Sequence, residues 1–195
     1  GDVKRFVKIL DDLIDNNQDA LFRSCEQVEA PLRLTEVIQH YIEFAEEAAV
    51  WKKYGKTLKA IVASFISGRD EVKLHDNGLL WAKKEGVALT WMNTYVDGKP
   101  VNERAGYQVE TNCFWYNALK FVSIMESKYG RDKRFVAECN DICSRIEQIF
   151  LPVFWTEERQ HLADYVDGNG QNIILDSWSL KSFFLSFSCS SIEWR

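Results

Sequence analysis

The stretch that decides the fold is residues 110–150, ETNCFWYNALKFVSIMESKYGRDKRFVAECNDICSRIEQIF. Apolar side chains recur in it every three or four residues, which is the spacing of a helix that buries one side. Gly130 interrupts this pattern, and Pro152 follows its end. Glycine commonly ends a helix and proline cannot continue one. We therefore expect helices over 110–129 and 132–150, joined into an antiparallel hairpin.

A second pair of helices is predicted upstream, over 34–54 and 57–66, with Gly55 as the stop between them. The connection KYGK at 53–56 is similar to KYGR at 128–131. Two hairpins with similar turns suggest a helical repeat or a toroid of paired helices.

The N-terminal segment is predicted to hold one more helix. Residues 3–14 have apolar side chains at helical spacing, with Lys and Asp between them. Residues 15–29 are polar and irregular, which indicates a loop. Thr35 is a candidate N-cap for the helix that follows.

The segment between the two helix pairs, residues 73–109, has no helical period. Loops of this length are uncommon in compact domains and usually functional. The dipeptide Asp97-Gly98 predicts the turn of a β-hairpin over 87–101. The aromatic side chains of this segment are Trp81, Trp91, Tyr95 and Tyr107.

This composition is suited to sugar recognition, because indole and phenol rings stack on the C–H faces of sugars and planar polar groups pair with hydroxyls. The polar side chains are Asp76, Glu85, Asn93, Asp97, Asn102, Glu103, Arg104, Glu110 and Asn112. Glycoside hydrolysis needs two carboxyl groups flanking the scissile bond, and composition cannot choose that pair. Composition alone favours the alternative, a solvated loop with buried aromatic anchors.

The overall composition excludes several classes of function. The formal charge of −5 gives no basic surface for nucleic acid or anionic lipid. No uninterrupted apolar stretch reaches the length of a membrane span. Five irregularly spaced cysteines make a poor disulfide framework and no zinc pattern, so we expect reduced thiols, a cytoplasmic location and no metal.

Five short motifs resemble the C-terminal amylo-α-1,6-glucosidase domain of glycogen debranching enzymes. That family reads DGLL, LTWMD, a Pro-Arg-Gly segment, VEIN and LWYNAL in this order. The corresponding stretches here are DNGLLW (76–81), LTWMN (89–93), GKPV (98–101), VETN (109–112) and WYNAL (115–119). The Pro-Arg-Gly segment departs from the family and reads NERAG (102–106), which keeps Arg104. Weaker similarity joins Glu29-Ala30-Pro31-Leu32 to the family's DAPLW segment.

The resemblance implies an all-α fold, a partial (α/α)6 toroid over residues 1–170, with a long loop and a short β-hairpin between helix pairs. It implies inverting acid/base hydrolysis of α-1,6 branch stubs in glycogen-like glucans, without a metal or organic cofactor. In the family the Asp of TWMD is the general acid and a Glu much further along is the base. The catalytic positions are then Asn93 and, as a substitute acid, Glu110. The predicted substrate-binding residues are Asp76, Trp81, Trp91, Arg104, Asn112, Trp115 and Tyr116.

The chain also departs from the family pattern. Asn93 is a carboxamide and cannot donate the proton that the leaving group needs. Glu110 precedes an apolar helix, where a capping or hydroxyl-binding role is equally expected. Residues 171–195 match no family motif, and we expect an atypical, altered or truncated tail there. An alternative function is therefore an inactive glucan-binding module, and a third is a helical interaction scaffold. A half-toroid would expose apolar faces, so homodimerisation is also predicted.

Overall fold

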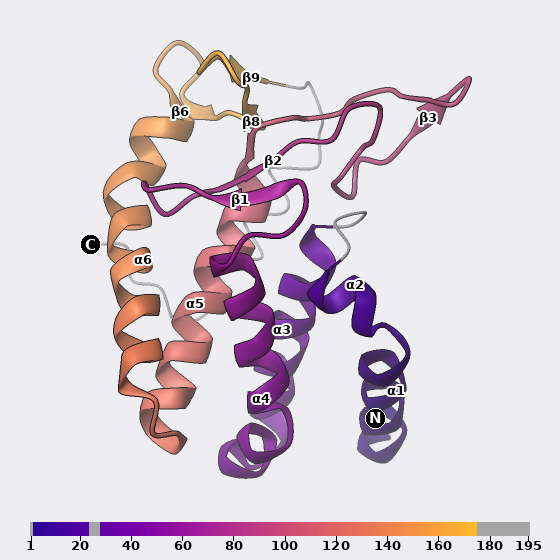
Figure 1. The fold of residues 1–195 in the computed structure, drawn as a ribbon, viewed down its shortest axis with the longest axis vertical. Coiled ribbons are helices and arrows are strands. Elements are labelled where there is room, and N and C mark those ends of the chain that lie inside the picture. Colours follow the sequence, from indigo (N-terminus) through magenta and orange to yellow (C-terminus); the bar gives the residue numbers. More distant parts are fainter. Residues whose placement is uncertain (1, 24–27, 175–195) are drawn as a thin grey trace.

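The computed structural model describes residues 2–23 and 28–174. This part is mostly helical, with small two- and three-stranded sheets gathered at one end (Figure 1). The longer helices stand side by side, with α1 at one edge of the row and α6 at the other. The helices are α1 (Val3–Asn16), α2 (Gln18–Phe22), α3 (Glu29–Tyr41), the 3-10 helix η1 (Ile42–Phe44), α4 (Glu47–Ile66), α5 (Val109–Tyr129) and α6 (Lys133–Phe154).

Helix α5 is the centre of the fold. It packs against α3, α4 and α6 and has apolar side chains on most of its circumference, as expected for a helix buried on several sides. Trp115 is fully buried and lies against Phe65 of α4, with ring centroids 5.7 Å apart. Its indole N–H donates to the carbonyl of Gly78 at 3.2 Å, so the buried donor is satisfied.

The predicted hairpin between α5 and α6 is confirmed. Helix α5 ends at Tyr129, followed by Gly130, and Asp132 caps α6 by accepting from the backbone N–H of Phe135 at 3.1 Å. Glu126 reinforces the turn, because its Oε1 accepts from the backbone N–H groups of Arg131 and Asp132.

The predicted break at Gly55 is wrong. Helix α4 runs continuously from Glu47 to Ile66, and the chain instead reverses at η1. Gly55 is needed for packing, since a Cβ there would lie 2.8 Å from the indole of Trp51. The similarity between KYGK and KYGR therefore does not mark equivalent turns.

Other helix boundaries also differ from those predicted. Thr35 lies inside α3, where its hydroxyl donates to the carbonyl of Pro31 at 3.3 Å, so it is no N-cap. Pro152 lies within the last turn of α6, which continues to Phe154. Residues 15–29 were predicted as a loop, yet α1 extends into them and α2 lies among them.

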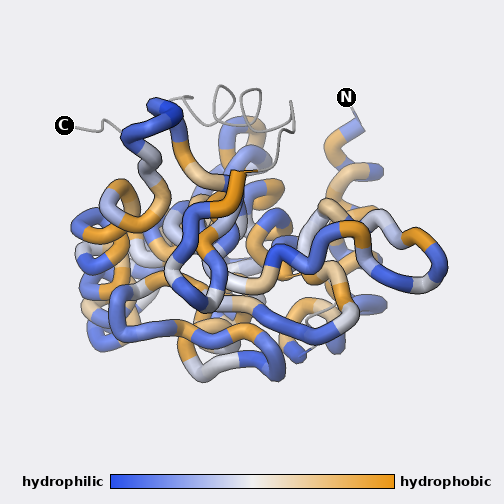
Figure 2. Tube along the Cα trace, turned by 90° about the horizontal axis from the view of Figure 1, so that it is seen from above, coloured by the Kyte–Doolittle hydropathy of each residue, from blue (hydrophilic) through white to orange (hydrophobic). Residues whose placement is uncertain are grey.

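The strands occupy the end of the helix row where α4 and α6 finish and α5 begins. We call this end, residues 68–108 and 155–174, the loop face. Seen from above, it is crossed by hydrophilic segments with hydrophobic ones between them (Figure 2). The antiparallel pairs are β1 (Val72–Leu74) with β2 (Leu80–Ala82), β3 (Tyr95–Val96) with β4 (Lys99–Pro100), β6 (Trp155–Thr156) with β7 (His161–Leu162), and β5 (Tyr107–Gln108) with β8 (Tyr165–Val166) and β9 (Asn172–Ile173).

The β3–β4 hairpin confirms the predicted turn. Asp97 and Gly98 both have positive φ, 49° and 74°, as a type I′ turn requires. The paired strands are shorter than the predicted 87–101. Strand β9 lies beyond the predicted domain boundary at residue 170, and the tail from residue 175 onward lies outside the described residues.

Two further predictions can be compared with the described part. Cys139 and Cys143 are buried free thiols, and burial raises the pKa of each to about 12; Cys113 is also a free thiol. Within residues 2–23 and 28–174, no helix has both the length and the apolar content needed to cross a membrane.

Candidate active site

Arg104 and Glu110 form a buried ion pair at the base of the loop face. The guanidinium donates to both carboxylate oxygens, with Nη2 2.7 Å from Oε2 and Nη1 against Oε1. It also donates to the hydroxyl of Thr90 at 3.1 Å and to the carbonyl of Asp164 at 3.0 Å. Arg104 and Glu110 are each 1% exposed. Both oxygens of Glu110 are thus occupied from within the protein.

Local structure explains why these two side chains meet. Glu110 lies in the first turn of α5, where the helix dipole favours a carboxylate. Gln108 donates to the carbonyl of Arg104 at 2.7 Å and so holds the preceding loop against the helix start. Asn112 pairs with both the N–H and the carbonyl of Leu80, which fixes β2 beside α5.

Gly106 lets the C-terminal strands join this arrangement. Its φ is +143°, and a Cβ there would lie 2.0 Å from the carbonyl oxygen of Val166. Only glycine therefore permits the approach of β5 to β8. This approach brings Tyr165 and Asp167 to the loop that carries Arg104.

Trp91 is held by the buried ion pair while remaining partly exposed. Its indole N–H donates to Oε1 of Glu110 at 3.0 Å, and the residue is 42% exposed. A charge-assisted hydrogen bond to the buried Glu110 carboxylate therefore fixes the orientation of the exposed indole. Asn93, the predicted general-acid position, lies two residues after Trp91 and is exposed.

Glu29 adds a second carboxyl group to this buried cluster. It is 4% exposed and its Oε1 has no hydrogen-bond partner. Burial, followed by the charge of Glu110, raises the pKa of Glu29 to about 7, against the opposing charges of Arg33 and Arg104. The Arg33 guanidinium lies 3.9 Å away and is half-exposed, whereas Arg104 is already paired with Glu110. The positive charge of the buried Arg104 guanidinium therefore acts on Glu29 as well as on Glu110, with which it is paired.

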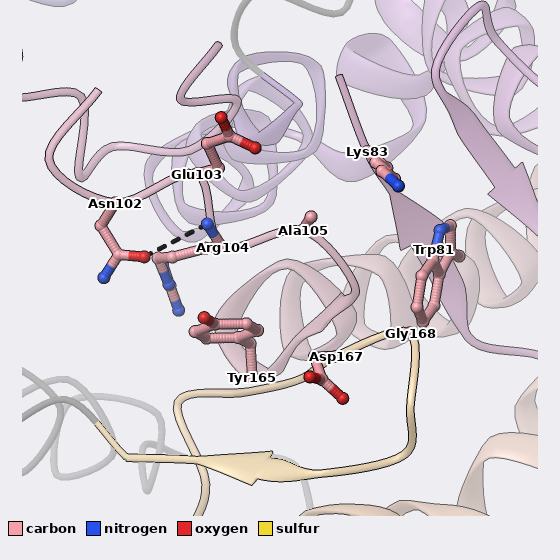
Figure 3. Close-up of a pocket in the computed structure, with 9 residues that line it drawn as sticks. All are labelled: Trp81, Lys83, Asn102, Glu103, Arg104, Ala105, Tyr165, Asp167 and Gly168. Carbon is pink, nitrogen blue, oxygen red and sulfur yellow. Dashed lines mark hydrogen bonds between the residues drawn. The ribbon is translucent and has the colours of Figure 1, made fainter. Parts of the chain in front are cut away.

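A pocket of about 260 Å³ opens on the loop face beside this cluster. Figure 3 shows Trp81 and Lys83 on one side of it and Asn102 and Glu103 on the other. The lining is one indole, one phenol and several polar groups. The lining residues are Trp81, Lys83, Asn102, Glu103, Arg104, Ala105, Tyr165, Asp167 and Gly168.

The Trp81 side chain is braced by two neighbouring rings. The His75 ring stacks parallel to the indole, with centroids 5.7 Å apart, and Tyr107 meets it edge-on at 4.9 Å. His75 Nδ1 and the Tyr107 hydroxyl are 2.6 Å apart, within hydrogen-bond distance, so the two bracing rings are tied to each other. The indole wall of the pocket is therefore held in place before any ligand arrives.

The structure brings only some of the residues predicted for the site together. Trp91, Arg104 and Glu110 form one connected cluster, and Trp81 lines the pocket. Trp115 and Asn112 are buried and bind backbone groups, so the structure gives them positioning contacts. Tyr116 is buried, with its hydroxyl donating to Glu147 at 2.5 Å, and Asp76 is exposed beside α6, where its carbonyl accepts from Arg145. Their predicted roles in substrate binding and catalysis stay predictions.

Sequence reasoning assigned no site role to Lys83, Tyr165 and Asp167, or to buried Glu29. Tyr165 and Asp167 reach the pocket only through the pairing of β5 with β8, which joins segments far apart in the chain. No local pattern predicts that pairing. Within the part of the chain that the structure describes, no cluster of His, Cys, Asp and Glu side chains is arranged to hold a metal ion.

Comparison with known proteins gives two matches. Residues 6–186 match the protein family described as Amylo-alpha-1,6-glucosidase. Among solved structures, the chain is similar to a GH78 family rhamnosidase of Bacillus sp. GL1, with a TM-score of 0.55 and 16% sequence identity. The similarity covers 84% of this chain and 16% of the rhamnosidase chain. At that identity it bears on the fold alone. No curated protein matches the sequence.

Proposed function

Because the chain belongs to the amylo-alpha-1,6-glucosidase family, we propose that it is a glycoside hydrolase domain of the debranching type, whose loop face takes α-1,6 branch stubs of glycogen-like glucans. The observation that carries the proposal is the pocket beside Trp81, where a braced indole faces polar side chains. The partial (α/α)6 toroid that the family resemblance implies is part of the same proposal. No metal or organic cofactor is needed by it.

The pocket suits a single sugar unit. Its volume of about 260 Å³ lies below the range of roughly 300–1,000 Å³ typical of drug-sized ligands. Trp81 offers an apolar surface for the C–H face of a glucose ring, and Lys83, Asn102 and Glu103 offer donors and acceptors for its hydroxyls. Trp91 gives a further indole, more exposed than that of Trp81, on the same loop segment, suited to another unit of the glucan.

Inverting hydrolysis needs an acid and a base, with carboxyl groups roughly 6.5–9.5 Å apart. Asn93 supplies a carboxamide at the acid position. Glu110 is enclosed by Arg104 and Trp91, which favours a positioning role for it over proton donation. These observations favour a second candidate function, a glucan-binding module of the same family that lacks the general acid.

Binding is tested by titrating the chain with maltotriose and following tryptophan fluorescence. We expect saturable quenching, and Trp81→Ala should weaken binding about tenfold, because burying an aromatic face contributes roughly 1.5 kcal/mol. Phe44→Ala is the matched control. Phe44 is 76% exposed and lies between α3 and α4, at the end of the helix row opposite the loop face. Equal affinities for the wild type and both variants would contradict the proposed pocket.

Catalysis is tested by converting Asn93→Asp and measuring glucose release from a branched limit dextrin. Release by this variant, and none by the wild type, would support debranching chemistry limited by the missing acid. If Asn93→Asp binds maltotriose and releases no glucose, the glucan-binding module is the better account. Glucose release by the unaltered chain would instead require an acid other than residue 93.

A further inference from the structure

Helix α1 carries an apolar stripe that stays partly exposed among the residues that the structure describes. Leu10 and Ile14 point into the core, whereas Val3 is 46%, Phe6 37%, Ile9 56% and Leu13 43% exposed. These four recur at helical spacing along neighbouring parts of the same side. Figure 1 shows α1 at the edge of the helix row, with open space on its outer side.

The neighbouring helix α3 widens the stripe. The Phe6 ring contacts the Tyr41 ring at a centroid distance of 5.2 Å. Val37 lies one turn before Tyr41 on the same face of α3 and is 41% exposed. The exposed apolar surface thus continues from α1 onto α3.

The charges of α1 are arranged against the dipole of the helix. Its N-terminal half carries Lys4, Arg5 and Lys8, and its C-terminal half carries Asp11, Asp12 and Asp15. The first turn of the helix has no acidic side chain and the last turn has no basic one. A helix dipole favours the opposite order, so the stability of α1 by itself does not explain this pattern.

Among the described residues, contacts within the chain account for one of these charges, that of Asp11. Asp11 accepts from Lys53 at 2.6 Å and from Tyr54 at 2.9 Å. In residues 2–23 and 28–174, the side chains of Arg5 and Asp12 form no hydrogen bond or ion pair with another described residue. Seven residues, or about two turns, separate them, so both lie along the same border of the apolar stripe.

We propose that two copies of this chain associate through α1, as an antiparallel helix pair about a two-fold axis near Ile9. In this arrangement Phe6 packs against Leu13 of the partner subunit, and Arg5 faces Asp12 of the partner subunit. The basic start of each helix then lies beside the acidic end of the other. The two helix dipoles are antiparallel, so the positive N-terminus of each lies beside the negative C-terminus of the other. Parallel pairing would place like charges together. The self-complementary charge pattern identifies a second copy as the occupant.

The expected dimer is weak. A helix of 14 residues is about 21 Å long, and interfaces of that extent lie at the small end, below about 1,200 Å² of total buried area. Association should therefore be visible by sedimentation equilibrium at roughly tens of micromolar chain and above, with monomer prevailing well below that concentration.

Charge reversal gives a test that depends on the antiparallel pairing. Arg5→Glu and Asp12→Arg should each weaken self-association on the order of tenfold, since each replaces two attractive pairs per dimer with repulsive ones. A mixture of the two single variants should form a heterodimer of near wild-type affinity, and the double variant Arg5→Glu/Asp12→Arg should self-associate again. Arg134→Glu, an exposed charge reversal on α6 at the opposite edge of the row, should change nothing.

Several outcomes would overturn the proposal. One is a chain that stays monomeric at the highest soluble concentration. Another is a dimer unaffected by Ile9→Glu, which places a charge at the centre of the stripe. A mixture of Arg5→Glu and Asp12→Arg that fails to associate would exclude the antiparallel arrangement. Circular dichroism of each variant confirms that the helices remain folded.

Discussion

Replacing Arg104 by methionine should destabilise the domain far more than the loss of a surface charge. Methionine keeps much of the volume of the side chain and removes the guanidinium. The Glu110 carboxylate is then left in the interior, with the Trp91 indole as the remaining donor to it. Removing one partner of a buried ion pair costs about 3–5 kcal/mol, because the other charge stays desolvated and unpaired. The folding equilibrium constant should fall roughly 10²- to 10⁴-fold.

The assay is urea unfolding followed by far-UV circular dichroism, near neutral pH and at low micromolar chain, where monomer is expected. Lys120→Met is the matched control. It breaks the ion pair of Lys120 with Glu147, whose side chains are 40% and 41% exposed. Exposed pairs contribute about 0–1 kcal/mol, so this variant should lose no more than that.

A double variant separates the charge effect from lost packing. In Arg104→Met/Glu110→Leu both charges are gone, and an apolar pair of similar volume is often neutral compared with the ion pair. We therefore expect the double variant to recover part of the stability that Arg104→Met loses. If Arg104→Met is no less stable than Lys120→Met, the buried pair is not what fixes the base of the site, and the positioning of Trp91 by Glu110 loses its support.

Two further predictions concern the packing around the site. Folding raises the pKa of Glu29 from about 4.5 to about 7, so between these pH values the native chain keeps a proton that the unfolded chain has released. The free energy of unfolding should therefore fall by about 3 kcal/mol as the pH rises across that window. Urea unfolding at several pH values measures this slope, and Glu29→Gln should flatten it. Identical slopes for both proteins would refute this explanation of the cluster. Gly55→Ala should lower the midpoint of unfolding although alanine is the better helix former by about 1 kcal/mol, because the new Cβ would lie 2.8 Å from the Trp51 indole. A higher midpoint would mean that the indole moves aside freely.

Much of the helical fold could be predicted from the sequence, because it depends on local periodicity. The α5–α6 hairpin follows from apolar spacing and Gly130, and the Asp97-Gly98 turn follows from its need for positive φ. The same kind of local pattern predicted a helix end at Gly55, and that prediction was wrong. A glycine inside a helix is disfavoured by propensity alone, yet tertiary packing of Trp51 requires the missing side chain.

The candidate site was only partly predictable, since its wall is built from segments distant in the chain. The family motifs pointed to Trp81, Trp91 and Arg104, which lie in the loop face, and to Glu110, which lies in the first turn of α5. Their predicted roles in binding and catalysis stay predictions. Their partners followed from non-local contacts, such as the pairing of β5 with β8 that brings Tyr165 to the pocket. The motifs also could not show that Arg104 points inward to Glu110. The cytoplasmic location and the division at residue 170 stay predictions.

The most direct test of sugar binding at the loop face is nuclear magnetic resonance of the chain with ¹⁵N-labelled tryptophan, titrated with a branched maltooligosaccharide. The seven indole N–H groups give separate signals. If the loop face binds sugar, the signals of Trp81 and Trp91 shift in a saturable manner while those of buried Trp51 and Trp115 stay still. Indole signals that do not move at millimolar sugar, or shifts that spare both Trp81 and Trp91, would contradict it.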